Sequence, residues 1–268
     1  PVSRVKLPHS DGMSPQAVQV DIGPTGTIYV RQREVLCKST DGGRSWTARP
    51  IKLPPGLKLG FRWKVLRDGS FISVACPVGK VIEEPATAWV SRDEGVTWTK
   101  RAEIAVDKLP LRSGKPYVER YTHRGLNRLR DDTLIWGIDV RDDPYLNGTA
   151  LYFFRSTDGG HTWDGPRLVS DRGASEGGTV RLPSGRLFAT VRLGMTVRPS
   201  DPPLLMTFTQ KINTAPFNGR HRIKNLFVMD SDDHGKTWGP PRLLTTVFGQ
   251  TFGYPAVQRD GTVVVIHD

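Results

Sequence analysis

One eight-residue pattern, S-x-D-x-G-x-[ST]-W, occurs four times in this chain and limits its fold more than any other feature. The copies begin at Ser39, Ser91, Ser156 and Ser231, and each matches every specified position. In such a segment the Asp accepts hydrogen bonds from the backbone of a turn and the Gly supplies a positive φ. The Trp anchors the turn by burying its ring. We call this segment the Asp box and take it as the repeated unit of the fold.

Each Asp box lies between two apolar runs, which makes it the tip of a hairpin. A second repeated element is a turn followed by an apolar strand, and it occurs five times: Gly26-Thr27-Ile28, Gly69-Ser70-Phe71, Asp132-Thr133-Leu134, Gly185-Arg186-Leu187 and Gly261-Thr262-Val263. Two such hairpins in series make a four-stranded antiparallel blade, and radial repetition of blades makes a β-propeller. The sequence therefore predicts an all-β propeller without helices beyond short turns.

Five first hairpins but only four Asp boxes indicate four complete blades and half of a fifth. We expect residues 1–268 to form a single propeller domain that lacks its C-terminal part, because an open ring leaves sheet edges exposed. A six-bladed ring would need roughly one and a half further blades.

Charge and cysteine usage exclude some classes of partner. The net charge is +11, but the basic residues are scattered among acidic ones without a Lys/Arg block, so we predict no nucleic-acid partner. No apolar run reaches the roughly 20 residues of a membrane span. Cys37 and Cys76 each lie in a strand-like run and are predicted to be buried free thiols. We predict no metal and no cofactor, and the excess of arginine suits an anionic sugar.

The two ends of each blade differ in their connections. The Asp boxes and first turns share one end, where they are short and uniform, and we interpret them as scaffold. The connections at the other end are longer and more varied, covering residues 99–121, 138–149, 164–176 and 193–222. Variable loops on a rigid scaffold carry binding and catalysis, so the site is predicted at this second end, around the central axis.

Counting back from each first turn gives the residue that opens each innermost strand at the axis: Arg62, Arg124, Glu176 and Tyr254. His123 adjoins Arg124, and the second strands end near Arg31, Asp139, Arg141 and Arg192. The planar fork of Arg matches a carboxylate, so these side chains favour a site for a small anion. The alternative is that these polar side chains line the propeller axis together with water and bind no ligand.

The Asp boxes resemble those of the sialidases (neuraminidases), and residues 175–192 resemble the fourth blade of that family. The resemblance implies three arginines that hold a sialic acid carboxylate, an attacking Tyr, a Glu that activates this Tyr, and an Asp as general acid and base. Glu176 would be the activating Glu and Arg192 one of the arginines.

Several positions depart from the family pattern. The Arg-Ile-Pro motif of the first blade is absent, and Phe61-Arg62-Trp63 is only a loose echo of it. The segment around Tyr254 resembles the tyrosine segment but comes one blade after Glu176, where the family has two. The nucleophile is therefore Tyr254 or a tyrosine beyond residue 268. Candidates for the general acid are Asp139, Asp142 and Asp143.

These observations favour a sialidase-like exo-glycoside hydrolase that removes a terminal acidic sugar from a glycan. Its predicted catalytic residues are Glu176 and Tyr254, and its predicted substrate-binding residues are Arg192, Arg62, Arg124 and His123. One alternative is a non-catalytic propeller that binds a glycan or a protein. Another is a hydrolase in which Glu176 acts with a second carboxylate, about 5–5.5 Å away in a retaining enzyme or about 6.5–9.5 Å away in an inverting one. The family resemblance implies a secreted or periplasmic protein, and the sequence does not indicate an oligomeric state.

Overall fold

The structure of the chain is a computed structural model. It describes residues 18–32, 34–54, 62–76, 83–109, 117–118, 126–143, 148–171, 174–193, 225–245, 253–258 and 260–267. Within these ranges the regular structure consists of antiparallel strands and one 3₁₀ turn, η2 (Val106–Lys108). No helix in this part of the chain is long and apolar enough to cross a membrane.

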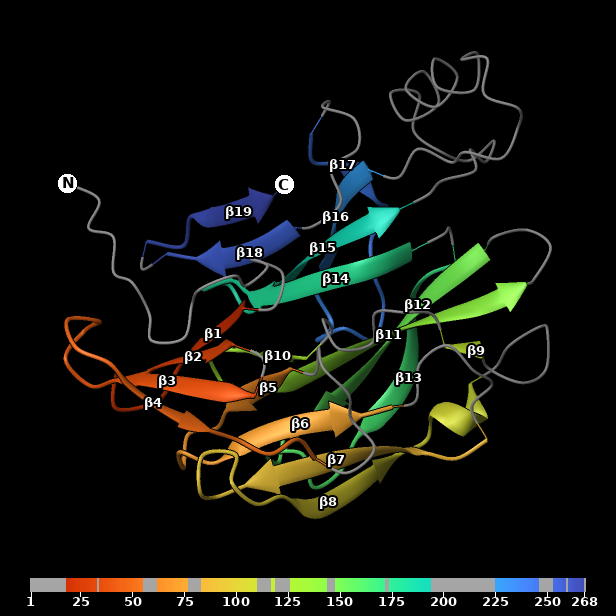
Figure 1. Cartoon of the computed structure of the whole chain (residues 1–268). Coiled ribbons are helices and arrows are strands. Elements are labelled where there is room, and N and C mark those ends of the chain that lie inside the picture. The colour runs from red at the N-terminus through yellow and green to blue at the C-terminus, as the bar shows by residue number, and fades with distance from the viewer. Residues whose placement is uncertain are drawn as a thin grey trace, which may run out of the picture.

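The strands form five separate sheets that follow one another in chain order (Figure 1). The first contains β1 (Val18–Ile22), β2 (Ile28–Gln32), β3 (Val35–Ser39) and β4 (Thr47–Pro50). The second contains β5 (Trp63–Val65), β6 (Phe71–Ala75), β7 (Ala86–Ser91) and β8 (Thr99–Ile104). We refer to the sheets as blades 1 to 5.

Blade 3 contains β10 (Asn127–Arg128), β11 (Leu134–Asp143), β12 (Gly148–Ser156) and β13 (Asp164–Ser170), with β9 (Tyr117–Val118) pairing β11 as an addition. Blade 4 contains β14 (Ala174–Arg181), β15 (Leu187–Leu193), β16 (Asn225–Ser231) and β17 (Arg242–Leu243). Blade 5 is the hairpin of β18 (Gly253–Val257) and β19 (Val263–His267), which lies beside β14.

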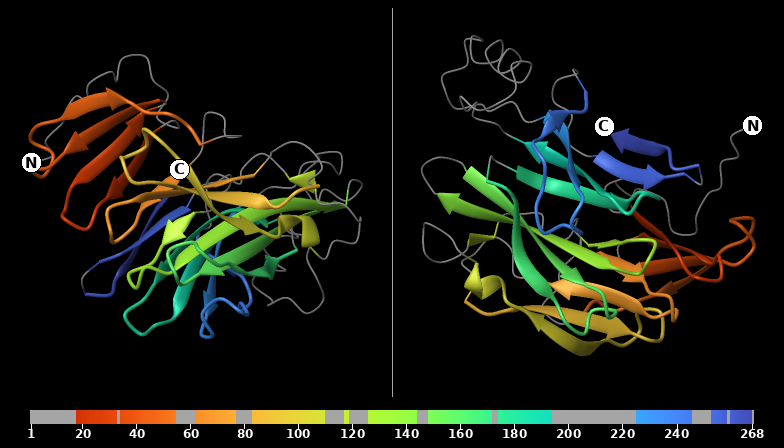
Figure 2. Two further views of the ribbon diagram at one scale, coloured as in Figure 1. Left: turned by 90° about the horizontal axis from the view of Figure 1, so that it is seen from below. Right: turned by 180° about the vertical axis from the view of Figure 1, so that it is seen from behind.

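The predicted all-β propeller with antiparallel blades is confirmed (Figure 2). Each of blades 1 to 4 has the expected order of strand, first turn, strand, connection, strand, Asp box and strand. The ring of six blades and the missing C-terminal part stay predictions.

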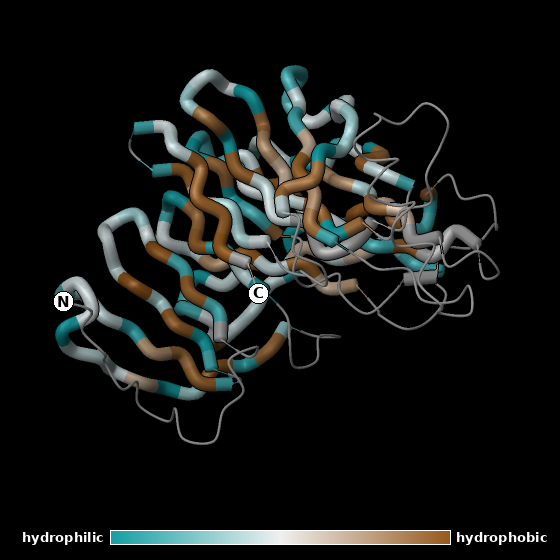
Figure 3. Tube along the Cα trace, turned by 90° about the horizontal axis from the view of Figure 1, so that it is seen from above, coloured by the Kyte–Doolittle hydropathy of each residue, from teal (hydrophilic) through white to brown (hydrophobic). Residues whose placement is uncertain are grey.

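Apolar side chains fill the space between neighbouring blades, because alternate residues of each strand face opposite sides of the sheet. In blade 2 the rings of Trp63 and Phe71 stack at 4.9 Å between centroids. Tyr29 of blade 1 meets Phe71 edge-on at 5.0 Å and so joins the two blades. A second cluster joins blades 2 and 3 through Ile72, Val74, Trp136 and Phe154, among others. Hydrophobic residues accordingly follow the strands and hydrophilic ones gather at the turns (Figure 3).

The Asp boxes form the turns that the sequence predicts. In the third box, Asp158 Oδ1 accepts hydrogen bonds from the Ser156 hydroxyl (2.8 Å) and from the N–H groups of His161 and Thr162 (both 3.0 Å). Its Oδ2 accepts the Thr162 hydroxyl at 2.6 Å. Gly160 has a φ of 89°, as the left-handed turn requires. These contacts are those of a scaffold.

The tryptophans of the boxes are less buried than expected. All four are half-buried: Trp46, Trp98, Trp163 and Trp238. The indole N–H of Trp46 donates to the Gly43 carbonyl of its own turn at 3.0 Å. This bond holds one edge of the Trp46 ring on its own turn, and the rings of the other three box tryptophans pack against the hydrophobic clusters of the blades.

Arginines on outer strands connect consecutive blades. Arg49 on β4 donates to the backbone carbonyls of Asp93 (3.0 Å) and Glu94 (2.7 Å) in the Asp box of blade 2. Arg101 on β8 donates to the carbonyl of Gly159 in the Asp box of blade 3 at 2.7 Å. Each of these blades is therefore fastened to the next at the Asp-box end.

Two sheet faces expose apolar side chains. On β1, Val20 and Ile22 are 56% and 55% exposed, while Gln19 and Asp21 face β5 and bond its backbone. On the β18–β19 hairpin, Tyr254 and Ile266 are 47% and 67% exposed. In the described part of the structure, blades 1 and 5 thus each expose apolar side chains on one face.

Candidate functional site

The first turn and the Asp box of each blade lie at the same end, as predicted. In blade 4, Arg186 of the first turn pairs with Asp232 of the box, with 2.7 Å between Nε and Oδ1. The register sets Leu187 opposite Ser231 beside these turns. The candidate site must therefore be sought at the other end, where β2 and β15 finish and β5, β14 and β18 begin.

Two arginines at that end, one from each of the first two blades, are within electrostatic range of each other. Arg31, at the end of β2, is only 4% exposed, and its guanidinium lies 5.9 Å from the centre of the Trp63 ring. Burial, and then the positive charge of Arg62, lower the pKa of Arg31 to about 10. Two guanidinium groups that repel each other in a partly dry site favour an anion between or beside them.

Further cations lie along the innermost strands. Burial lowers the pKa of Lys64 on β5; Asp21 opposes this shift, and Arg62 and Arg128 add to it. Arg128 on β10 also donates to the Val65 carbonyl. The sequence analysis did not single out Lys64 or Arg128, although each belongs to an innermost strand and this position was the available signal.

Glu176 and Arg192 lie on adjacent strands of blade 4. Ser175 pairs with Arg192, and the register between β14 and β15 shifts between Ser175 and Gly178. The backbone of Glu176 therefore occupies an irregular segment next to Arg192, and such bulges often redirect a side chain near a site. The Glu176 side chain lies outside the described part of the structure, so its catalytic role stays a prediction.

Tyr254 opens β18 as expected, and its side chain lies on the exposed face of that strand. The neighbouring residues face blade 4: Gly253 accepts a hydrogen bond from the Thr190 hydroxyl at 2.8 Å, and Pro255 packs against Gly178. Because side chains alternate along a strand, Tyr254 points away from blade 4. The structure thus brings its backbone close to β14 but not its phenol, and its role as nucleophile stays a prediction.

The remaining candidates are only partly visible. His123 and Arg124 lie outside the described residues. Asp139 is 3% exposed within β11, whereas only the backbone is described for Arg141, Asp142 and Asp143 in the same strand. The described residues contain no group of three or more His, Cys, Asp or Glu side chains placed to hold a metal ion. On the described residues, this end therefore combines the basic side chains of Arg31, Arg62 and Arg192 with one buried carboxyl group, that of Asp139.

Solved structures with the same fold include several glycoside hydrolases. An α-L-arabinanase of Penicillium chrysogenum complexed with arabinobiose is 16% identical; the match covers 97% of this chain and 77% of that chain with a TM-score of 0.59. A GH93 α-L-arabinofuranosidase of Fusarium graminearum, also with arabinobiose, is 17% identical over 96% of this chain and 71% of that chain, with a TM-score of 0.54.

A sialidase from Streptococcus pneumoniae is 14% identical over 91% of this chain and 33% of that chain, with a TM-score of 0.49. At these identities the likeness establishes the shared fold only. No curated protein sequence matches this chain. Residues 17–266 match the family described as "BNR repeat-like domain", and the chain therefore belongs to this family of Asp-box propellers, as its four boxes predict.

Proposed function

We propose that this chain is the propeller of an exo-acting glycoside hydrolase that removes a terminal acidic sugar of the sialic acid type. The observation that carries the proposal is a buried Arg31 whose guanidinium lies 5.9 Å from the centre of the Trp63 ring, together with the half-buried Arg62 that acts on its charge. A carboxylate on the substrate would offset the repulsion between these guanidinium groups and accept their hydrogen bonds.

The proposed roles follow from position. Arg62, Arg192, Arg124 and His123 bind the substrate, and Arg31 is added to them because the charge of Arg62 acts on it. Glu176 acts as the base that activates a tyrosine, since a neutral phenol is a weak nucleophile without one. Tyr254 is the proposed nucleophile. A six-bladed ring, as in sialidases, would surround this axis.

An α-L-arabinosidic substrate is the second candidate. It is favoured by the names of the two arabinan-degrading enzymes that share the fold over most of this chain. Arabinose carries no charge, so Arg31 and Arg62 would offer its hydroxyls hydrogen bonds without the charge pairing that a carboxylate adds.

Hydrolysis of two fluorogenic substrates tests the proposal. We expect release of 4-methylumbelliferone from its N-acetyl-α-neuraminide and none from its α-L-arabinofuranoside. Glu176→Gln should lower kcat with little change in KM, because it removes a base without removing binding groups. Arg192→Ala and Arg62→Ala should raise KM instead. Lys236→Ala, on the exposed Asp-box end of blade 4, is the control and should match the unaltered protein.

Each outcome has a defined meaning. Cleavage of the arabinofuranoside alone would replace the proposed substrate by the second candidate. If neither substrate were cleaved but sialyllactose bound and Arg62→Ala weakened it, the non-catalytic propeller would be the correct interpretation. Binding of neither sugar would refute a glycan site at the axis.

A further inference from the structure

A groove of about 660 Å³ opens between blades 1 and 2 at the Asp-box end, opposite the axial site. The first turns of both blades and the second Asp box line it, including Thr25, Thr27, Ser70, Arg92 and Glu94. A cavity of this size accepts one or two sugar units. Among the residues that the structure describes, none of those proposed to act in glycoside hydrolysis lines it.

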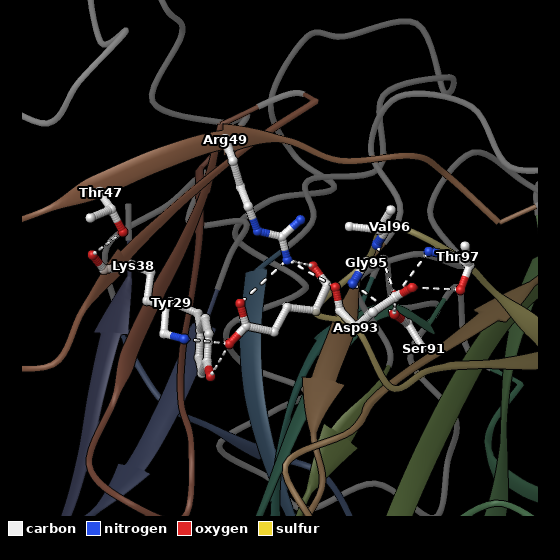
Figure 4. A network of polar contacts seen from close by, with 10 residues as sticks. Tyr29, Lys38, Thr47, Arg49, Ser91, Asp93, Gly95, Val96 and Thr97 are labelled. Atoms are coloured by element: carbon white, nitrogen blue, oxygen red, sulfur yellow. Dashed lines mark hydrogen bonds and ion pairs between the residues drawn. The ribbon is translucent and has the colours of Figure 1, made fainter.

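Glu94 forms part of the lining. Its partners Tyr29, Lys38 and Arg49 belong to the network of polar contacts that Figure 4 shows. Glu94 Oε1 accepts the Tyr29 hydroxyl at 3.1 Å and the Lys38 ammonium at 2.6 Å, and Arg49 reaches its Oε2 at 3.3 Å. Burial opposes ionisation of Glu94, but the bonds from Lys38 and Tyr29 outweigh it and lower its pKa. Glu94 also adopts a φ of 55°, where the first and third boxes have glycine. Such strain persists because the surrounding contacts hold it.

Positive charge exceeds negative charge in and around this groove. Glu94 faces two cations, Lys38 and Arg49. Asp132, in the first turn of blade 3, also faces two: Arg67 at 2.6 Å and Arg128 at 4.0 Å. Two carboxylates are thus each matched by a pair of basic side chains.

Asp68 repeats this arrangement within the groove. Its Oδ1 accepts the Ser70 N–H at 2.9 Å and the Ser70 hydroxyl at 2.6 Å. Burial raises its pKa, but these bonds and the charges of Arg101 and Arg92 lower it overall. Asp68 therefore already has donors of its own, and its single negative charge faces two arginines.

Arg92 is exposed on this groove and forms no hydrogen bond or ion pair in the described part of the chain. Its five N–H donors are available to a ligand. The hydroxyls of Thr25 and Thr27, 2.9 Å apart, add donors and acceptors on the blade 1 side. A planar cation next to hydroxyl groups matches a ligand that carries both an anionic group and hydroxyls.

We propose that the groove between blades 1 and 2 binds an acidic saccharide, with its carboxylate or sulfate on Arg92 and its hydroxyls on Thr25, Thr27 and Lys38. This second sugar site lies at the end opposite the axial site and does not depend on the proposed hydrolase activity. The groove would hold one part of a glycan on the protein, and the axial site would bind a terminal sugar at the opposite end of the blades.

Isothermal titration of the whole chain with a hyaluronan tetrasaccharide, which carries carboxylates, tests this site. Neutral chitotetraose is the uncharged comparison and sodium sulfate the inorganic one. We expect the hyaluronan fragment to bind more tightly than either, and Arg92→Ala to weaken it roughly tenfold or more through loss of a charge-assisted bond. Arg92→Lys, which keeps the charge but loses the fork, should have an intermediate effect.

Lys236→Ala removes one positive charge from the Asp-box end of blade 4 and should leave binding unchanged. Arg192→Ala should also leave it unchanged, which separates this site from the axial one. The proposal is overturned if hyaluronan does not bind, if chitotetraose or sulfate binds equally well, or if Arg92→Ala has no effect. Loss of binding in Arg192→Ala would overturn it too, by assigning the sugar to the axis.

Discussion

Replacing Asp158 by Ala should destabilise the propeller without contributing directly to any catalytic step. The carboxylate accepts four hydrogen bonds within the third Asp box, from two hydroxyls and two N–H groups. Three of these hydrogen bonds are exposed, so their donors can bond water once the carboxylate is removed. The Ser156 hydroxyl differs, because it also accepts the buried N–H of Gly160 at 2.8 Å. We therefore expect a loss of about 1–3 kcal/mol in the free energy of unfolding.

Chemical denaturation followed by tryptophan fluorescence measures this loss. Asp164→Ala is the matched control, because Asp164 directly follows the box and forms only an exposed pair with Arg167 at 3.0 Å. Its effect should stay within about 0.5 kcal/mol. If Asp158→Ala proved as stable as Asp164→Ala, the box carboxylate would not be a scaffold group. Loss of activity at full stability would move the functional site to the Asp-box end.

The same carboxylate predicts how stability depends on pH. Burial opposes the shift, but the Thr162 and Ser156 bonds lower the pKa of Asp158 to about 2. A lowered pKa means that the stabilisation is complete above about pH 4 and is lost as the pH falls towards 2. Asp158→Ala should therefore show a smaller loss of stability across this range than the unaltered protein, and equal losses would contradict the assignment.

Three further predictions concern other parts of the fold. Glu94→Gln should cost about 1 kcal/mol by weakening the ion pairs between blades 1 and 2, and an unchanged denaturation midpoint would contradict this. Gly160→Ala should destabilise the protein more than Gly26→Ala. Both glycines have a positive φ, but only at Gly160 would a Cβ clash with the buried Ile72 of β6. Equal effects of the two substitutions in denaturation would refute the packing of Gly160 against Ile72. Burial raises the pKa of Cys76 to about 12 and also raises that of Cys37, so neither thiol should react with a thiol reagent at pH 8 until the protein is unfolded. Rapid reaction of the native protein would show that the interior of these blades opens.

The blade plan could be predicted from the sequence because it rests on local chemistry. The turn at Gly185 and the box at Ser231 each contain their own Asp, Gly or hydroxyl contacts, so a short segment determines the hairpin. The start of β5 could be predicted in the same way, because Arg62 directly precedes its first residue, Trp63, whereas β14 begins at Ala174 and not at the predicted Glu176. Arg62 was located by counting back from the turn at Gly69.

Contacts between blades could not be predicted in the same way, because they depend on the angle and spacing of neighbouring sheets. Glu94 is the only glutamate at its position, since the other three boxes have glycine or histidine there. Nothing in the segment itself indicates that Tyr29 and Lys38 lie within reach of its carboxylate. The direction of the Tyr254 phenol likewise depends on the packing of neighbouring blades. It follows from which face of β18 packs on blade 4, which involves Pro255 and Gly178.

The arginines that connect consecutive blades have a consequence for how the propeller comes apart. Arg49 and Arg101 hold carbonyl groups of the following blade, so damage in one Asp box reaches the preceding blade directly. The free energy of the array is then close to a sum of blade terms and nearest-neighbour terms. Amide hydrogen exchange should consequently be graded along the described strands. It should be slower in blades 2 and 3, which pack against a blade on each side, than in β18 and β19, whose Tyr254 and Ile266 side chains are exposed.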